Sequence, residues 1–465
     1  METPSSIAAH KASVIEPMLG RARTYTAQGD DQAAQRLYLE VLRIDPTHRL
    51  ALNEIGLLAL TNGYRDAART AFQQAAQHHP NDLTAWVTLG NMALEDGDLP
   101  AARGHYQNAL AQNADCAPAC QGMARVLTLL GEDDAARPHW DRGFSGRAVV
   151  SRHYRGIEPG LDVLFLAASR GGNVRLRPWM DDRVFAVTVI YADYFDVTQK
   201  LPPHRLVVNA IGDADLCPEA LSRAQAIVAQ SNAPVVNHPA RVQNTGRGAI
   251  SQLFAQIAGL IVPRTVLTPR QVLLTTPPTG FPLLLRSPGF HTGQHFVRID
   301  APQDLPRALA RLPGDALFAI EYLNAKGAGG MTRKYRVMFI DGAIYPWHLA
   351  ISADWKVHYY TAAMADHPSH REEEKQFLEN MPEVIGARAM AALRALQHRL
   401  GLDYAGVDFA LDRDGAVLLF EANAAMTMNA PPPEPIWDYR RAAVAAAQKA
   451  VAAMLRRRAQ KVAAF

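Results

Sequence analysis

The segment Tyr404–Asn423 reads YAGVDFALDRDGAVLLFEAN, and it places the strongest constraint on the fold. Residues 404–411 and 416–423 are rich in the aliphatic and aromatic residues that strands favour. The turn-forming residues Asp412–Gly415 separate these two stretches. The segment therefore predicts a β-hairpin near the end of the chain.

Two acidic residues of this hairpin are expected to face each other. If Asp414 and Gly415 form a two-residue loop, counting outward sets Asp408 opposite Glu421. A four-residue loop leaves both carboxylates on the same face. Their β-carbons would be about 5 Å apart, so their repulsion calls for a cation or a shared proton. Asn423 points to the same side, which completes an all-oxygen set suited to Mg²⁺. The alternative is a solvated pair of acids on an exposed sheet.

The N-terminal third of the chain repeats with a period of 34 residues. Each unit carries a glycine, then an alanine pair, then an aromatic residue. The glycines are Gly29, Gly63, Gly97 and Gly131, the alanine pairs begin at Ala33, Ala67, Ala101 and Ala135, and the aromatic residues are Tyr38, Phe72, Tyr106 and Trp140. Glycine permits a turn between two helices, and alanine allows close helix contact. The pattern predicts four helix pairs over about residues 15–150.

One stretch of the repeat carries a family pattern, in Trp86, Leu89 and Gly90 followed by Ala102 and Tyr106. This pattern and the period resemble the tetratricopeptide repeat, although Ala93 stands where that family prefers tyrosine. The resemblance implies an all-α solenoid with a concave groove for a peptide or protein partner. Dimerisation through the repeats, which would make a homo-oligomer, is the alternative.

Strand-like periodicity replaces helical periodicity after the arginine-rich residues 147–155. Strands are predicted at 161–168, 184–191, 205–211 and 234–237, and a helix at 218–230. Alternating strands and helix predict a small parallel sheet. The pair Gly171 and Gly172 after the first strand is interpreted as a tight turn and not as a nucleotide site.

A second hairpin is predicted farther along, with strands at 281–286 and 295–299 and a loop of small residues between them. Small residues let backbone amides approach a phosphate, while Arg286 and His291 supply charge or hydrogen bonds. The loop is therefore a candidate phosphate-binding segment. A solvent-exposed glycine-rich turn is the alternative.

An ordered set of segments runs through this part of the chain: Phe281–Arg286, Glu321–Leu323, Arg336, Asp408, and then Glu421 with Asn423. The order resembles the ATP-grasp ligases, such as glutathione synthetase and the ribosomal-protein glutamate ligase, and covers the chain after about residue 158. A chain of 465 residues is too long for one ordinary core, so a multidomain protein is expected. Its parts would be a tetratricopeptide-like domain at 1–150, a pre-ATP-grasp α/β domain at 151–240, and an α+β ATP-grasp domain at 241–465, with a helical entry at 237–250.

The resemblance also implies a role for each matching position. Nucleotide binding falls to Arg247, Arg286, His291, Gly293, Glu321, Tyr322 and Leu323; catalysis to Arg336 and Arg286; substrate binding to His348, Lys356 and His358; and Mg²⁺ binding to Asp408, Glu421 and Asn423. In this reading Glu321–Leu323 form the hinge that recognises adenine, and Arg336 faces the reacting phosphate.

This chain departs from the family pattern in several places. Arg247 and Arg286 replace lysines, which keeps the charge but changes reach and geometry. Lys334 stands where relatives often have aspartate. Residues 424–427 replace a Ser-Pro-Gly turn, which bears on the acceptor side of the site.

The activity implied is ADP-forming ligation of a small-molecule carboxylate to an amine, such as an amino acid or peptide. ATP and Mg²⁺ are the cofactors, and an acyl phosphate is the intermediate. The repeats would bind a peptide or protein, either as substrate or as partner. The alternative is a catalytically inactive nucleotide-binding scaffold or sensor whose function lies in the repeats.

The composition bears on the partners of the protein, on its compartment and on membrane insertion. A net charge of +3, from 48 basic and 45 acidic residues, is too balanced to indicate a nucleic-acid partner. Three cysteines argue for a reducing compartment, so a cytoplasmic protein is expected. Cys116 and Cys120 are spaced like metal ligands on a helix, but buried thiols are the favoured reading. The absence of a signal pattern after Met1 and of a long apolar stretch argues against membrane insertion.

Overall fold

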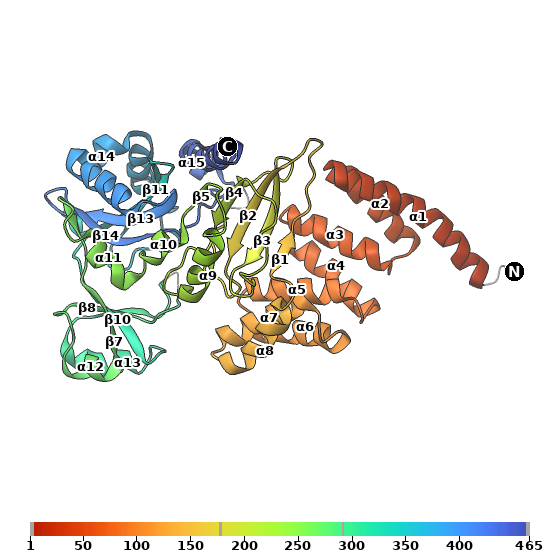
Figure 1. The fold of residues 1–465 in the computed structure, drawn as a ribbon, viewed down its shortest axis with the longest axis horizontal. Coiled ribbons are helices and arrows are strands. Elements are labelled where there is room, and N and C mark those ends of the chain that lie inside the picture. The colour runs from red at the N-terminus through yellow and green to blue at the C-terminus, as the bar shows by residue number, and fades with distance from the viewer. Residues whose placement is uncertain (1–3, 176–178, 291–292, 462–465) are drawn as a thin grey trace. The chain divides into compact units, whose positions relative to one another are not determined.

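The computed structural model describes residues 4–175, 179–290 and 293–461, and it divides into two compact units. The first unit is Met1–Arg147 and the second is Ala148–Phe465 (Figure 1). The sequence places the corresponding boundary after residue 150. The further division predicted at residue 240 stays a prediction.

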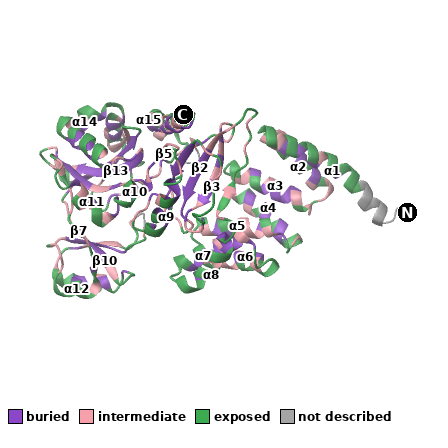
Figure 2. Cartoon of the chain, viewed as in Figure 1, coloured by how far each residue is buried: buried purple, intermediate pink, exposed green. Residues whose placement is uncertain are grey.

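The first unit is a succession of helix pairs with the predicted period. Its described residues form α1 (Pro4–Gln28), α2 (Asp31–Ile44), α3 (Arg49–Thr61), α4 (Arg65–His78), α5 (Leu83–Glu95), α6 (Leu99–Gln112), α7 (Ala117–Leu129) and α8 (Asp133–Phe144). Most of these helices bury residues along one side and expose the other (Figure 2). This division is what a stack of amphipathic helices requires.

The regular spacing of the glycines and the aromatic residues has the expected structural cause. Gly29, Gly63, Gly97 and Gly131 each lie between the two helices of a pair, with φ values of 78°, 83°, 78° and 78°. Glycine adopts this left-handed conformation without the strain that a β-carbon brings. The aromatic residues at the next repeated position are buried, with Tyr38, Phe72 and Tyr106 fully so.

The second unit begins with a five-stranded sheet in the order β1-β3-β2-β4-β5. Its strands are β1 (Val149–Ser151), β2 (Leu161–Ala167), β3 (Phe185–Tyr191), β4 (Leu206–Asn209) and β5 (Val235–Val236). β2 to β5 are parallel, as predicted, and β1 adds an antiparallel edge. The predicted helix is α9 (Pro218–Val228).

Two further sheets complete the second unit. The antiparallel sheet β7-β10-β8-β9 contains β7 (Thr265–Pro269), β10 (Ala316–Glu321), β8 (Leu283–Arg286) and β9 (Phe296–Ile299). The sheet β12-β11-β13-β14-β6 contains β12 (Ala343–Ser352), β11 (Thr332–Ile340), β13 (Tyr404–Leu411), β14 (Val417–Asn423) and β6 (Leu260–Ile261). The helices are α10 (Pro239–Gln243), α11 (Arg247–Phe254), α12 (Arg270–Thr275), α13 (Leu305–Leu309), α14 (Pro368–Leu400) and α15 (Asp438–Gln460).

One predicted helix is divided in the structure. The stretch 237–250 forms α10 and α11, because the chain turns at residues 244–246 between them. Gly246 is the N-cap residue of α11, so Arg247 is the first residue of a new helix. This break brings Arg247 to a helix N-terminus.

The predicted hairpin is present, but its turn differs from the two-residue loop expected. Asp412 N donates to Ala416 O over 2.9 Å, so the loop comprises the three residues 413–415, and Gly415 has a φ of 74°. Three-residue hairpin loops commonly end in such a left-handed residue. The observed register near the turn pairs Leu411 with Val417.

A β-bulge then restores the pairing on which the predicted site depends. The register shifts between Phe409, which pairs with Leu419, and Asp408, which pairs with Glu421. Without the extra residue, Asp408 would lie opposite Phe420, and Glu421 would point to the other face. The prediction that Asp408 faces Glu421 is therefore correct, although the assumed loop is wrong.

Candidate functional site

A cavity of about 960 Å³ in the second unit is lined by residues from all three of its sheets or their connections. It collects the residues that the sequence assigned to one site: Arg247, Arg286, Gly293, Glu321, Tyr322, Leu323, Arg336, His348, Lys356, His358, Asp408, Glu421 and Asn423. His291, also assigned to the site, lies outside the described residues. The described residues to which the family resemblance assigns a role therefore line one cavity.

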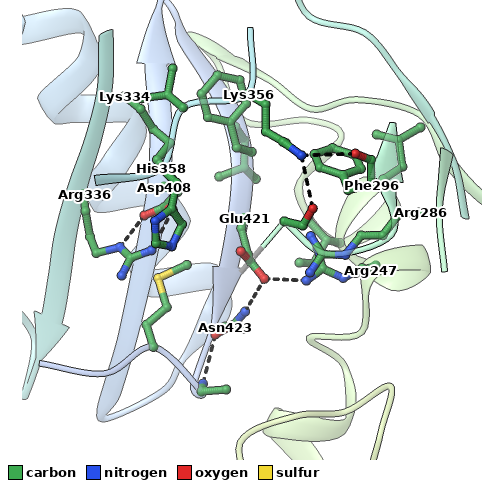
Figure 3. A pocket seen from close by; sticks show the side chains of 18 of the residues that line it. Arg247, Arg286, Phe296, Lys334, Arg336, Lys356, His358, Asp408, Glu421 and Asn423 are labelled. Atoms are coloured by element: carbon green, nitrogen blue, oxygen red, sulfur yellow. Dashed lines mark hydrogen bonds and ion pairs between the residues drawn. The ribbon is translucent and has the colours of Figure 1, made fainter. Parts of the chain in front are cut away.

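Asp408 is bonded by two basic side chains of β11. Arg336 Nε donates to Asp408 Oδ1, and Arg336 Nη2 donates to Oδ2 over 2.7 Å, while Lys334 Nζ donates to Oδ2 over 3.0 Å (Figure 3). Burial would raise the pKa of Asp408, but the charges of Arg336 and Lys334 hold it well below its usual range. This group is one carboxylate with two cations, and it carries an excess positive charge.

Glu421 has a separate set of partners. Arg247 Nη2 donates to Glu421 Oε1 over 2.6 Å, and Asn423 Nδ2 donates to the same oxygen over 2.9 Å. Burial would raise the pKa of Glu421, but Arg247 and Arg286 lower it. Figure 3 shows Lys334 and Arg336 on one side of the two carboxylates, and Arg247 with Arg286 on the other.

The arrangement revises the electrostatic argument for a metal. Basic side chains already offset the repulsion between Asp408 and Glu421, so charge alone does not require a divalent ion. Across residues 4–175, 179–290 and 293–461, no three acidic, histidine or cysteine side chains are grouped to hold one. Two carboxylates and the Asn423 amide oxygen nevertheless fit Mg²⁺, which commonly keeps water and phosphate ligands. Asn423 Oδ1 accepts from Ala425 N and retains a second lone pair.

The loop between β8 and β9 is held over the cavity at its described ends. Arg286 Nη2 donates to Phe290 O over 2.6 Å, and Lys356 Nζ donates to Gly293 O over 3.3 Å and to Phe296 O over 3.5 Å. Burial and the charge of Arg247 lower the pKa of Arg286 to about 10. Lys356 thus contacts the loop backbone, a partner that its predicted substrate-binding role did not include.

The predicted hinge residues lie where β10 ends. Glu321 N donates to Arg264 O over 2.9 Å, and the Glu321 carboxylate accepts from Arg264 N over 3.0 Å. Tyr322 lies under the Arg298 guanidinium, whose carbon is 4.3 Å from the ring centre. Glu321 therefore also holds the chain beside β7, in addition to lining the cavity.

His348 is a buried histidine next to the two-cation group, which consists of Asp408 with Lys334 and Arg336. It pairs with Arg336 across β11 and β12, its ring stacks on Tyr359 at 4.6 Å, and its Nε2 has no hydrogen-bond partner within the described chain. Burial, followed by the charge of Arg336, lowers its pKa well below the usual range. His348 is therefore neutral in the folded protein at neutral pH.

The buried state of His348 predicts a pH dependence of stability. Below about pH 6.5, the ordinary histidine pKa, the unfolded chain binds a proton that folded His348 does not. Stability should therefore fall as pH decreases, by up to about 1.4 kcal/mol per pH unit. Denaturant unfolding between neutral and mildly acidic pH measures this slope. The neutral variant His348→Gln should show a shallower slope, and equal slopes would contradict the assignment.

Two contributors to the site were not predicted. Asp215, in the connection between β4 and α9, accepts from Arg247 N over 3.1 Å and so caps α11. Arg440 of α15 lines the cavity and is paired with the buried Glu374 of α14. No local sequence signal marks these residues, because each acts on an element far away in the chain.

Comparison with known proteins finds a family match within the first unit. The tetratricopeptide repeat family matches residues 15–48, so the N-terminal part of the chain contains tetratricopeptide repeats, as predicted. No curated protein matches the chain.

Three solved structures illustrate the similarity. A MamA crystal structure is 24% identical over 26% of this chain and 71% of its own, with a TM-score of 0.25. A tetratricopeptide repeat protein from Parabacteroides merdae is 18% identical over 28% of this chain and 51% of its own, with a TM-score of 0.26. MamA from Desulfovibrio magneticus RS-1 is 20% identical over 28% of this chain and 73% of its own, with a TM-score of 0.25.

Two further expectations can be compared with the structure. Cys116, Cys120 and Cys217 are free and buried, in agreement with the reading of Cys116 and Cys120 as thiols packed in the core. Among the described residues, no helix combines the length and the apolar character needed to span a bilayer.

Proposed function

We propose that the second unit is an ADP-forming ligase of ATP-grasp type, which uses ATP and Mg²⁺ to join a carboxylate to an amine. One observation carries the proposal: two facing carboxylates, Asp408 and Glu421, are each bonded by basic side chains inside one cavity. The same cavity reaches the hinge Glu321–Leu323 and the glycine-containing loop. This arrangement supports the proposal that nucleotide, phosphate and acid bind in one cavity.

The two pairs of basic residues would have different roles in the proposed reaction. Arg247 and Arg286 would orient the phosphates, and Lys334 with Arg336 would stabilise the charge that develops as the phosphoryl group moves to the acid. Lys334 and Arg336 are two cations beside the single Asp408 carboxylate, so this group suits an anionic ligand. Arg286 is buried and preorganised by Phe290 O, which strengthens its effect on a bound phosphate.

Asp408, Glu421 and Asn423 are the residues that would hold Mg²⁺. The ion would neutralise phosphate charge during transfer. The loop held by Lys356 would exclude water from the acyl phosphate until an amine attacks it, which forms the amide and releases phosphate.

The tetratricopeptide repeats would supply a binding surface for a peptide or protein, either as the substrate or as a partner that positions the ligase. Stacked repeats form extended concave surfaces of the kind that hold such segments. Self-association through the same repeats stays the alternative, and sedimentation of the purified chain distinguishes the two.

Nucleotide binding tests the ligase proposal most directly. We expect calorimetric titration with a nonhydrolysable ATP analogue to show binding that requires Mg²⁺. Glu421→Gln should weaken that binding about tenfold or more, because it removes a charged ligand. Glu434→Gln, at an exposed position, is the matched control. A wild-type protein that binds no nucleotide would overturn the proposal.

A second function follows from the pairing of Arg247. This side chain is bonded to Glu421 and lies 3.9 Å from Asp215, so phosphate must compete with two carboxylates for it. That competition favours a nucleotide-binding scaffold or sensor without turnover. ADP release during a screen of carboxylates and amines would support the ligase, whereas nucleotide binding without ADP release would support the scaffold.

A further inference from the structure

Arg440 is a buried cation that lines the cavity and has no part in the function proposed above. It lies in the first turn of α15, and only 4% of its surface is exposed. Its Nε is 3.3 Å from Glu374 Oε1 but makes no hydrogen bond. Within the described chain, Nε is also the only one of its three nitrogens sealed from solvent without a partner. Since Arg440 lines the cavity and its Nε is sealed, we infer that the two Nη atoms are the ones that face the cavity.

The surroundings of Arg440 hold its guanidinium in place. The guanidinium carbon lies 4.3 Å from the centre of the Tyr359 ring. Glu374, on the other hand, accepts from Tyr359 over 2.9 Å, from Tyr439 over 2.6 Å and from Leu349 N over 3.3 Å. Glu374 is thus well supplied with donors, while the donors of Arg440 are left without acceptors. The sealed Nε bears the cost of an unmade hydrogen bond, whereas the Nη donors are open to an acceptor that enters the cavity.

A chain of contacts connects Arg440 with the two-cation group at Asp408. Tyr359 contacts Arg440 and stacks on His348, and His348 is the cross-strand neighbour of Arg336. Arg336 and Arg440 therefore line the same cavity, with His348 and Tyr359 connecting them. Arg336 already donates to Asp408 through Nε and Nη2, so a ligand with two separate anionic groups would add one acceptor beside each arginine.

We propose that Arg440 binds a second carboxylate of the acid substrate, so that the cavity selects dicarboxylates. The inference rests on the proposed ligase function, in which the first carboxylate reacts beside Arg336. A planar guanidinium matches a carboxylate through paired hydrogen bonds. A monoanion suits this position better than a phosphate does, because the Glu374 carboxylate lies behind Arg440 and offsets its charge.

The test compares diacids with monoacids of the same carbon number. Succinate, glutarate and adipate, and the matching monocarboxylates, are titrated into the full chain by calorimetry. We expect at least one diacid to bind about tenfold or more tightly than its monoacid, as loss of a charged hydrogen-bonded pair predicts. The absence of any diacid preference in the wild type would overturn the inference.

Variants assign the preference to Arg440. Glu374→Gln with Arg440→Met avoids leaving a buried carboxylate unpaired, and it should abolish the preference. Arg456→Met, at an exposed position of the same helix, is the control and should leave the preference unchanged. Should the double variant not fold, Arg440→Lys decides: a preference at least threefold smaller supports the inference, and an unchanged one overturns it.

The two proposals fail in distinguishable ways. The acid titrations need no nucleotide, so a protein that binds a diacid but no ATP analogue overturns only the ligase proposal. A protein that binds the analogue with Mg²⁺ but shows no diacid preference overturns only the role of Arg440.

Discussion

Asp408→Asn is expected to destabilise the second unit by about 3–5 kcal/mol and to abolish the ADP formation that the ligase proposal predicts. The substitution keeps the size of the side chain but removes the single negative charge that pairs with Lys334 and Arg336. The side chains of Asp408, Lys334 and Arg336 are 4%, 14% and 20% exposed, so water replaces the lost partner only in part. Two neighbouring cations would then be left in a partly desolvated site. Hydrogen exchange of β13 and β14, followed by mass spectrometry, localises the loss.

A second substitution separates the electrostatic cause from simple loss of packing. Adding Lys334→Met to Asp408→Asn removes one of the unpaired cations and should recover part of the stability, while ADP formation stays lost. Asp414→Asn, at the exposed tip of the same hairpin, should change stability by less than about 0.5 kcal/mol. The interpretation is wrong if Asp408→Asn exchanges as slowly as the wild type.

Tyr106→Ala is expected to destabilise the repeat unit by about 3–5 kcal/mol, the cost of removing a large aromatic side chain from a core. Tyr106 is fully buried, and two glycines make room for it. A β-carbon at Gly90 would lie 2.6 Å from the Tyr106 ring, and one at Gly122 would lie closer still. The ring therefore fills a space formed by two neighbouring helices, which cannot close after truncation because Gly90 and Gly122 have no side chains.

Hydrogen exchange in α5, α6 and α7 measures this effect, because repeat units are stabilised mainly by their neighbours. Tyr106→Phe is the control: it keeps the ring and loses the 2.7 Å hydrogen bond to Asn91 Oδ1, for about 1 kcal/mol. Exchange in β13 should not change in either variant. Equal effects of alanine and phenylalanine would show that the hydroxyl, and not ring packing, stabilises the repeats.

In the hairpin, the pairing of Asp408 with Glu421 was predicted correctly although the predicted two-residue loop is wrong. Apolar alternation, which repeats every two residues, identifies the strands β13 and β14, and the turn residues mark the break between them. Loop length and bulges carry no comparable signal. Here the three-residue loop shifts the register by one residue, and the bulge after Asp408 shifts it back. Asp408 consequently faces Glu421 through two compensating departures from the expected pairing.

The partners of the two carboxylates could not be predicted in the same way. Alternation indicated which face Asp408 and Glu421 share, but nothing local indicates that Lys334 occupies a carboxylate oxygen. The ion pairs join residues 74 and 174 positions apart, and they depend on how separate strands and helices are packed. For this reason the repulsion between the acids suggested a metal, whereas the folded chain supplies four basic side chains of its own.

The sequence by itself determined the features that a local periodicity defines. These are the 34-residue helical repeat, the change from helical to strand periodicity near residue 150, and the shared face of Asp408 and Glu421. Periodicity reports such features because each is set by neighbours a few residues away. Only the tertiary structure decided that Lys334 and Arg336 share Asp408, that Asp215 caps α11, and that Arg440 reaches the cavity from the last helix. These contacts arise when distant elements pack together, and that packing depends on the whole fold at once.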